Sequence, residues 1–378
     1  MKKDDETSLK DFVNSLDETG HERRAEMHSD SFFDNAPDDA TLVTRSREFD
    51  DIHKHYVRRQ VWLKLVKRVA AANGGNIHLL TLPGKFRFEV GLYQKCGLLK
   101  RVPHNGRDCL SVVGFETDPT TFGLLKTSGP PLLEMLLGSI LSALTDATSQ
   151  NGVLIRKHAP FDVINLDLTA NIANQHDGPY SPFLQSIREC FQLQGSQSTP
   201  WLLMVTFRTG LAETERRVVQ TLTDFFQTNL DTHLQFREQC LDAFDVESAA
   251  TLLERRPHDG VGLFTGKWIV EQGHQFEWEC AEFKHATFTR GFSHKDGSQD
   301  AYGMSKLCFL FKKRLAPRRQ LILRQVPAQS WHADDLARLI KPGNRVDVDS
   351  AVANLSESSR ARLAAEIEEF KQNQAITA

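Results

Sequence analysis

The sequence predicts an α/β fold in which a mainly parallel sheet is closed by an antiparallel pair of strands. Two patterns predict it. From residue 74 to about residue 235, short apolar runs typical of buried parallel strands alternate with segments of helical periodicity. Near the end of the chain, strand-like runs at 302–312 and 320–326 flank a short loop, which is typical of a hairpin. We further expect a helical N-terminal extension and an inserted lid.

Each element of the alternation follows from its own local pattern. Apolar runs bounded by turn residues predict strands at 76–82, 110–115, 153–155, 161–167 and 201–207. Apolar residues at helical spacing predict helices at 85–99, 133–144, 182–191 and 213–234. The segment 236–300 departs from this rhythm, because it is rich in Gly, His and aromatic residues and holds strand-like runs at 262–270 and 275–282. We interpret that segment as an insertion or lid.

The patterns divide the chain into six parts. Residues 1–40 hold five basic and twelve acidic residues with little periodicity, and they are expected to form a disordered acidic arm. The other parts are an N-terminal basic helix (41–73), the core of the sheet (74–235), the insertion or lid (236–300), the closing antiparallel strands (301–330) and a C-terminal helical tail (331–378).

Composition and cysteine usage favour a cytoplasmic protein. The hydrophobic fraction of 40% and the charged fraction of 25% are ordinary for a globular chain. The six cysteines are scattered without a C-x-x-C pair, which argues against a zinc ribbon and against a secreted disulfide framework. The most apolar stretch, 135–144, is too short to span a bilayer, and the first residues lack the apolar core of a signal peptide. We expect no membrane contact.

The run from Phe161 to Asp167 carries most of the functional signal. Its apolar and β-branched residues predict a buried parallel strand that ends in a carboxylate. Ligands of open α/β sheets bind just past the carboxyl ends of such strands. Asp167 and the nearby Asn165 are therefore candidate catalytic residues, although Asp167 could equally cap the turn that follows.

The whole pattern resembles a class I S-adenosylmethionine-dependent methyltransferase, a Rossmann-like fold. The strand that ends in Thr81-Leu82-Pro83-Gly84 matches the first strand and glycine turn of that family, and Glu116 ends the next strand. The resemblance implies that Thr81, Pro83, Gly84 and Glu116 bind S-adenosylmethionine, with the glutamate on the ribose hydroxyls. Glu116 is also open to a simpler interpretation, in which it belongs to the cap of the following helix.

A local likeness points within this family to tRNA guanine-N2 methyltransferases. Those enzymes carry a "YDVIDIDPFG" strand, which is similar to the run at 161–167, followed by a Pro-Phe-Leu helix start and a strand that ends in Val-Thr, similar to 182–184 and 205–206. The likeness implies that Asp167 and Asn165 orient a nucleophilic nitrogen in line with the cofactor methyl group, with proximity supplying most of the rate.

The chain departs from the family pattern at three places. Its first turn has the single glycine Gly84, and Leu168-Thr169 stands where the likeness would place Pro-Phe. The predicted third strand ends in Arg156-Lys157-His158, where the family places an acid for the adenine amino group. These departures leave open a second hypothesis: a non-catalytic binding or scaffold protein that kept the fold and lost the pocket.

A third hypothesis is a metal-dependent nuclease. Glu282-Phe283-Lys284 has the Glu-x-Lys spacing that holds a divalent metal and a water, and Asp259 could add a second ligand. Partners are also open. The basic residues of 54–68 suggest RNA or DNA binding, although a solvated helix face explains them as well, and the acidic arm at 1–40 could contact another protein.

Overall fold

The computed structural model describes residues 52–174, 181–211, 214–293, 299–314 and 337–375. Its strands are β1 (Leu79–Thr81), β2 (Arg101–His104), β3 (Arg107–Glu116), β4 (Leu132–Leu137), β5 (Val163–Asn171), β6 (Trp201–Arg208), β7 (Trp278–Ser293), β8 (Gln299–Lys313) and β9 (Arg345–Asp347). Its helices are α2 (Ile52–Val57), η4 (Arg58–Trp62), α3 (Leu63–Ala72), α4 (Phe88–Lys95), α5 (Pro119–Thr127), α6 (Ile140–Thr145), α7 (Gln150–His158), α8 (Pro182–Leu193), α9 (Arg216–Thr232), α10 (Leu234–Phe244), α11 (Ala249–Arg255), α12 (Pro257–Gln275), η5 (Pro342–Asn344), α15 (Val348–Ala353) and α16 (Glu357–Ala375).

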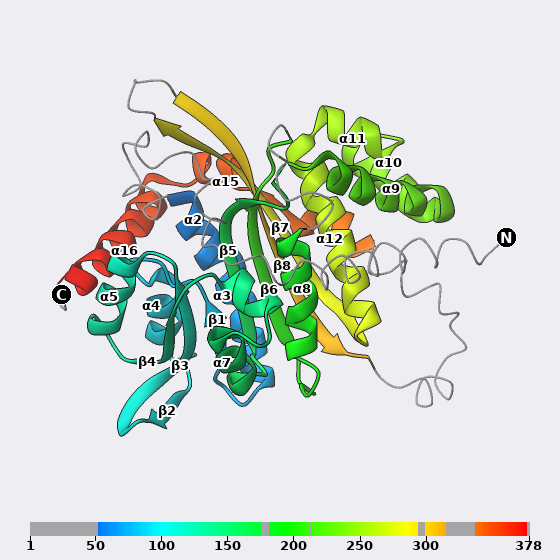
Figure 1. Cartoon of the computed structure of the whole chain (residues 1–378). Helices are drawn as coiled ribbons and strands as arrows, with labels where there is room; N and C mark the ends of the chain where they lie inside the picture. The colour runs from blue at the N-terminus through cyan, green and yellow to red at the C-terminus, as the bar shows by residue number, and fades with distance from the viewer. Residues whose placement is uncertain (1–51, 175–180, 212–213, 294–298, 315–336, 376–378) are drawn as a thin grey trace.

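One sheet joins all of these strands. Five parallel strands stand in the order β4-β3-β1-β5-β6, with β2 paired antiparallel to β3. Strand β8 then pairs antiparallel with both β6 and β7, and β9 lies parallel to β7 at the far edge. The five parallel strands follow the Rossmann order of an open α/β sheet, and the antiparallel pair is β8 with β7 (Figure 1). The predicted fold class is therefore confirmed.

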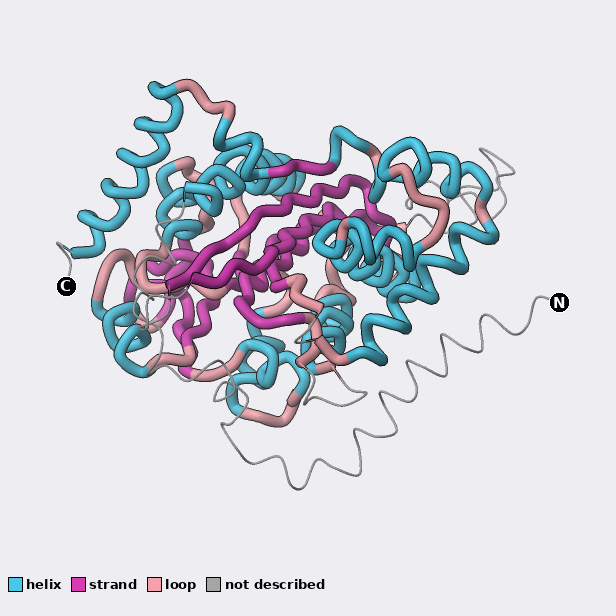
Figure 2. Tube along the Cα trace, turned by 90° about the horizontal axis from the view of Figure 1, so that it is seen from above, coloured by secondary structure: helices cyan, strands magenta, loops and turns pink. Residues whose placement is uncertain are grey.

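Helices cover both faces of the sheet, so the strands form a layer between them (Figure 2). On one face, α3, α4, α15 and α16 pack over apolar residues of β1, β3, β5, β6 and β8. On the other face, α6, α8, α9 and α12 bury a larger and more aromatic core. Burial on both faces explains why these strands read as continuous apolar runs in the sequence.

Four local predictions are wrong, and each has a physical reason. The helix expected at 133–144 is strand β4 followed by helix α6, because Gly138, with φ +132°, breaks the run and Ser139 caps a new helix. The strand expected at 153–155 lies in α7, which is the crossover helix that leads to β5. The strand expected at 262–270 lies in α12, whose burial on all sides hides its helical period.

The fourth correction concerns the strand that contains Asp167. Strand β5 does not end there but continues to Asn171, with an irregular register against β6 after Asp167. Asp167 therefore lies inside the strand, four residues before its end. Its side chain belongs to the sheet surface rather than to the turn beyond it.

The later parts of the chain follow the expected order in part. Residues 234–275 form three helices. The closing antiparallel pair does not have the expected members, because β8 pairs with β6 on one side and on the other with β7, which lies in the segment 236–300 expected to be an insertion or lid. The run 275–282 overlaps β7 as predicted, whereas the run expected at 320–326 lies outside the described residues, as does the acidic arm at 1–40. Residues 52–72 are helical, as expected for the N-terminal extension. None of the helices described is long and apolar enough to cross a membrane.

Candidate functional site

The sheet reverses its direction of growth between β1 and β5. From β1 the chain adds β3 and β4 on one side, and it then crosses over to add β5 and β6 on the other. Ligands of open α/β sheets bind at such a reversal, beyond the carboxyl ends of the strands. Thr81 of β1 and Asn165 of β5 are paired in register at this point.

Thr81 and Asn165 form a buried polar contact. The Asn165 Nδ2 group donates a hydrogen bond to Thr81 Oγ1 over 3.2 Å, and both side chains are fully buried. The other amide atom, Asn165 Oδ1, is buried and has no hydrogen-bond partner among the described residues. A buried acceptor without a donor is costly, so this oxygen marks a place where a ligand or an ordered water would be stabilising.

Asp167 belongs to a polar row that crosses three strands on the face covered by α3. In register, it stands beside Thr206 of β6, and Thr206 stands beside Lys306 of β8. The Lys306 Nζ group donates to Asp167 Oδ1 over 3.1 Å and to Thr206 Oγ1 over 3.2 Å. Its ammonium also lies 4.3 Å from the centre of the Trp62 ring, in a cation–π contact.

The cations around Asp167 keep its carboxyl group ionised. Burial alone would raise the pKa of Asp167, but the charges of Lys306, Lys54 and Arg58 outweigh burial and hold that pKa well below its ordinary value. Lys54 and Arg58 come from α2 and η4 and are both buried. Burial lowers the pKa of the Lys54 ammonium to about 8, although Asp167 acts in the opposite direction. Asp167 is therefore a fixed anion rather than a group that exchanges protons near neutrality.

Glu116 lies at the carboxyl end of β3, beside β1. One of its oxygens accepts hydrogen bonds from the backbone N–H groups of Thr117 and Asp118, over 2.8 and 3.0 Å. Asp118 in turn caps helix α5 by accepting from Thr121 N, with Pro119 at the first helical position. Glu116 thus takes part in the turn before α5, which is the simpler of its two interpretations, while it keeps its place at the sheet edge.

The turn after β1 packs closely on the neighbouring strand. Gly84 has φ +60°, a left-handed conformation that favours glycine. A Cβ atom on Gly114 of β3 would lie 3.3 Å from Pro83 Cγ, so the proline rests on the glycine. Arg87, also left-handed, donates to the carbonyl oxygens of Pro130 and Leu125 and so ties the turn to helix α5.

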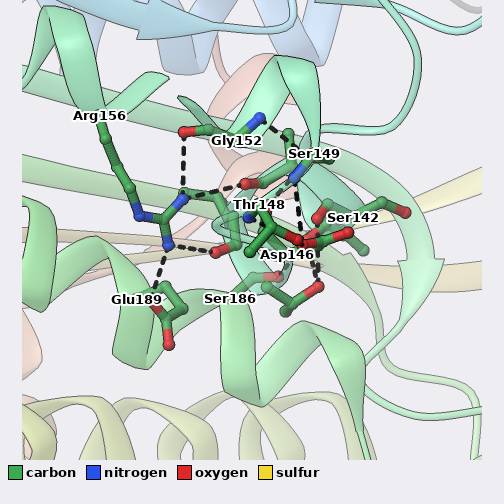
Figure 3. A network of polar contacts seen from close by, with 12 residues as sticks. Ser142, Asp146, Thr148, Ser149, Gly152, Arg156, Ser186 and Glu189 are labelled. Atoms are coloured by element: carbon green, nitrogen blue, oxygen red, sulfur yellow. Dashed lines mark hydrogen bonds and ion pairs between the residues drawn. The ribbon is translucent and has the colours of Figure 1, made fainter. Parts of the chain in front are cut away.

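Arg156 does not lie at this edge, contrary to the prediction for the third strand. It projects from α7 and donates to the carbonyl oxygens of Ala143 and Leu144 and to the Glu189 carboxylate (Figure 3). These bonds join α6, α7 and α8. The third parallel strand is β4, which ends at Leu137, so residues 156–158 do not stand where the family places its adenine-binding acid.

The residues of the nuclease hypothesis are engaged elsewhere. Glu282 forms an ion pair with Arg68, and Lys284 Nζ donates to the oxygens of Gly343 and Asn344. Asp259 lies in the first turn of α12, 3.8 Å from Arg256. Within the described part of the chain, no group of three or more His, Cys, Asp or Glu side chains is placed to hold a metal ion.

The basic helix divides into buried and exposed cations. Lys54 and Arg58 face the protein interior, and Arg59 contacts Glu366 of α16 over 3.0 Å. Lys64 and Lys67 are exposed. Much of the positive charge expected to face nucleic acid is thus directed at Asp167 and at other acids of the protein.

A cleft of about 490 Å³ lies between α9 and α11. Its lining includes Leu211, Arg216 and Glu254, and it includes none of Thr81, Gly84, Glu116 or Asp167. The cleft is therefore separate from the residues that the sequence singles out.

Three buried partners of Asp167 escaped the sequence prediction. Lys306 lies 139 residues away along the chain, and Lys54 and Arg58 belong to the basic helix that was expected to face either nucleic acid or solvent. A weak signal was present. Lys306 alternates with Met304 and Cys308 on one face of a strand, where an apolar residue is expected, and Lys54 and Arg58 are four residues apart on one helix face.

The comparisons with known proteins give one family and two distant structures. No match is found among curated proteins. A solved structure from Pyrococcus horikoshii, assigned to the RNA methyltransferases, aligns with 67% of this chain and 81% of its own, at 8% identity and a TM-score of 0.29. A SAM-dependent methyltransferase from Anabaena variabilis aligns with 72% of this chain and 97% of its own, at 10% identity and a TM-score of 0.28. Likeness at this level carries no argument, so the fold rests on the strand order.

The model of the PP_RS20740-like family matches residues 135–371, which is more than half of the chain. The chain therefore belongs to the PP_RS20740-like family.

Proposed function

We propose that this chain is a divergent methyltransferase-like protein that binds S-adenosylmethionine at the carboxyl edge of β1, β3 and β5. The observation that carries the proposal is the reversal of strand order between β1 and β5, which brings Thr81 and Asn165 into contact at the ligand edge of the sheet. The cofactor, when bound, supplies an electrophilic methyl group.

The hydrogen-bonding groups at this edge of the sheet match those of S-adenosylmethionine. Asn165 Oδ1 is a buried acceptor without a partner among the described residues, which suits the ammonium or amino group of the cofactor. Thr81, Pro83 and Gly84 would hold it through the turn after β1, and Gly84 allows the backbone to approach closely. Glu116, at the end of the adjacent strand, would accept from hydroxyl groups.

The substrate that suits this edge best is a nucleic-acid base or a similar polar group. Asp167 stays ionised, so it would orient an amino group by accepting its hydrogen bonds rather than by removing a proton. Together with Asn165 it would hold a nitrogen in line with the methyl group. The local likeness to tRNA guanine-N2 methyltransferases supports this class of substrate.

Isothermal titration with S-adenosylmethionine and with S-adenosylhomocysteine tests the proposal. We expect both to bind the unmodified protein, and we expect Glu116→Gln to weaken binding about tenfold, through loss of a charged hydrogen-bond acceptor. Glu134→Gln, on strand β4, is the matched control and should bind as the unmodified protein does. Absence of binding heat with both ligands at millimolar concentration would refute the proposal.

A second candidate is a binding protein without catalysis, and specific contacts favour it. Asp167 is paired with Lys306, and Glu116 accepts from the backbone of its own turn. If this candidate holds, Asp167→Asn leaves the function of the protein in cells intact, whereas the methyltransferase proposal predicts its loss. The substitution is isosteric, and a circular dichroism melt of the purified variant checks that it folds.

A further inference from the structure

The cleft of about 490 Å³ between α9 and α11 opens next to the end of strand β6. The two helices pack against each other at one end of the molecule (Figure 1). Leu211 and Thr214 belong to the lining and follow β6, which ends at Arg208. The cleft therefore begins close to the carboxyl edge of the parallel strands, where open α/β sheets bind their ligands. Its volume is in the range of small-molecule sites.

Each helix lines the cleft with the side chains of a single face. These residues include Arg216, Val219 and Thr223 of α9, and Ala250, Leu253 and Glu254 of α11. Residues three or four positions apart lie on the same side of a helix. The two rows of side chains therefore face each other across the cleft.

The walls of the cleft are held apart by the fold. Ala250 ends at its Cβ atom and so leaves space between the helices. The backbone N–H group of Ala249, at the start of α11, donates to Gln227 Oε1 of α9 over 2.9 Å. At the other end of α11, Thr209 Oγ1 and His258 Nδ1 are hydrogen-bonded over 2.6 Å, which ties the corner between α11 and α12 to the end of β6. These bonds fix the spacing of the two walls.

The hydroxyl groups of the lining are already used by the backbone. Thr214 Oγ1 donates to the carbonyl oxygen of Gly210 over 2.6 Å, and Thr223 Oγ1 donates to that of Val219 over 2.7 Å. Beside them, Val219 and Leu253 present apolar surface. The body of a ligand would therefore be bound by apolar contact, and its polar ends by other groups.

One charge of each sign stands on the opposite walls. Arg216 lies on α9 and Glu254 on α11, and they are the only charged side chains among the described residues that line the cleft. Within the described part of the chain, neither side chain has an ion-pair or hydrogen-bond partner, and they do not pair with each other. Arg255, the neighbour of Glu254, lies 3.6 Å from Asp245 instead. Both charges are thus available to a ligand in the cleft.

We propose that this cleft binds a zwitterionic small molecule, namely a free α-amino acid with an apolar side chain. Arg216 binds its carboxylate, because the guanidinium fork matches the two carboxylate oxygens. Glu254 binds its ammonium group, and Val219 and Leu253 contact its side chain. A ligand with a single charge would cover one of the two wall charges without compensating it, and that is unfavourable.

The inference goes beyond the proposed function. None of the residues that line the cleft is among those that would hold S-adenosylmethionine. The site can therefore exist with or without methyl transfer, and its main test uses no cofactor.

Isothermal titration with L-phenylalanine and with L-leucine measures the binding. We expect both to bind the unmodified protein with saturation at millimolar concentration. N-acetyl-L-phenylalanine lacks the ammonium group and L-phenylalaninamide lacks the carboxylate, so each should bind about fivefold more weakly than L-phenylalanine. Absence of binding heat with both amino acids, or equal affinity for L-phenylalanine and its two derivatives, would overturn the proposal.

Two variants assign the two charges separately. Arg216→Gln should weaken the binding of L-phenylalanine and of the N-acetyl derivative about fivefold, and it should leave the binding of the amide unchanged. Glu254→Gln should weaken the binding of L-phenylalanine and of the amide, and it should leave the N-acetyl derivative unchanged. Arg217→Gln, an exposed position of α9 outside the cleft, is the matched control and should bind all three as the unmodified protein does. The same losses for every ligand in both variants would contradict the assignment.

Titration of Arg216→Gln with S-adenosylmethionine separates this proposal from the proposed function. We expect the variant to bind S-adenosylmethionine as the unmodified protein does. Loss of that binding would assign the cleft to the cofactor and contradict a separate amino-acid site. Amino-acid binding by a protein that does not bind S-adenosylmethionine would contradict only the proposed function.

Discussion

The two ends of the β6–β8 strand pair bury different kinds of side chain. At one end, Trp201 stands beside Phe311 in register, and their rings stack 5.1 Å apart within the aromatic core. At the other end, Thr206 stands beside Lys306, and the ammonium is buried against Asp167. Both ends are buried, but the first buries rings on the α8 and α12 face and the second buries charge under α2 and η4.

The difference separates stability from function within one pair of strands. Aromatic burial is favourable by itself, and each ring pair adds about 0.5–1.5 kcal/mol beyond its buried area. A buried ion pair roughly balances its desolvation cost and is weak evidence for stability. The aromatic end therefore holds the sheet together, whereas the charged end is where a role other than stability is expected.

The largest expected effect is at the aromatic end. Trp201→Ala should lower the free energy of unfolding by about 3–5 kcal/mol, because the ring contacts Phe191, Trp278 and Phe311 and would leave a cavity. Urea denaturation followed by circular dichroism measures the change. Trp201→Phe, which keeps most of the packing, should lose clearly less. Equal losses in the two variants would show that ring packing does not govern this end.

A smaller effect is expected near the charged end, on the opposite face of the sheet, where Ser305 adjoins Lys306 on β8. A Cβ atom on Gly262 of α12 would overlap Ser305 Oγ and His285 Nε2, which are bonded to each other over 2.7 Å beneath the helix. Gly262→Ala should therefore lower the free energy of unfolding by about 1–3 kcal/mol. Gly123→Ala is the matched control, since that helical glycine has open space around it, and it should be neutral or slightly stabilising. The same denaturation experiment compares the two.

The smallest effect, and one of opposite sign, is expected at the charged end. Burial lowers the pKa of Lys54 to about 8 in the folded protein, against 10.5 for an ordinary lysine. Between these two pKa values, the lysine binds a proton more often in the unfolded chain than in the folded protein. The contribution of Lys54 to the free energy of unfolding therefore rises as pH increases from 8 to 10.5. Below pH 8, the cost of burying its ammonium is fully present. Lys54→Met should remove the cost of burying the ammonium and so stabilise the protein at pH 7. The gain should be only on the order of 1 kcal/mol, because the same substitution takes one cation away from Asp167.

Chemical denaturation of the unmodified protein and of Lys54→Met at pH 7 and at pH 10 checks this prediction. The difference between the two proteins should shrink at the higher pH. A Lys54→Met variant that is less stable at pH 7 would show that the ammonium stabilises the fold, and the two ends would then differ less in their contribution to stability.

The sequence predicted the strands that are buried on both faces, because continuous apolar runs leave few other interpretations. It therefore located β1, β3, β5 and β6 in the right order. It failed where local pattern and context disagree. Residues 133–144 have helical spacing, but a glycine with φ +132° divides them into a strand and a helix. Residues 262–270 lack any periodicity because α12 is buried around its whole circumference.

The candidate site was predicted only in part, for a similar reason. Asn165 and Asp167 stand out because polar residues interrupt an apolar strand. Their surroundings depend on the register between β5, β6 and β8 and on the packing of α2 over the sheet, and no single-sequence pattern reports either. Glu116 was correctly placed at a strand end, and the capping bonds of its turn could be foreseen from Asp118-Pro119.

The contact between α2 and α16 bears on how this protein is made. His55 lies 2.9 Å from Glu366, a residue 311 positions later, and Arg59 contacts the same carboxylate. At about 5–20 residues per second, the ribosome releases α2 roughly 15–60 s before that partner exists. During this interval His55 and Arg59 lack the Glu366 carboxylate. The packing of α16 on α2 is therefore among the last events of folding, after the C-terminal helix has emerged.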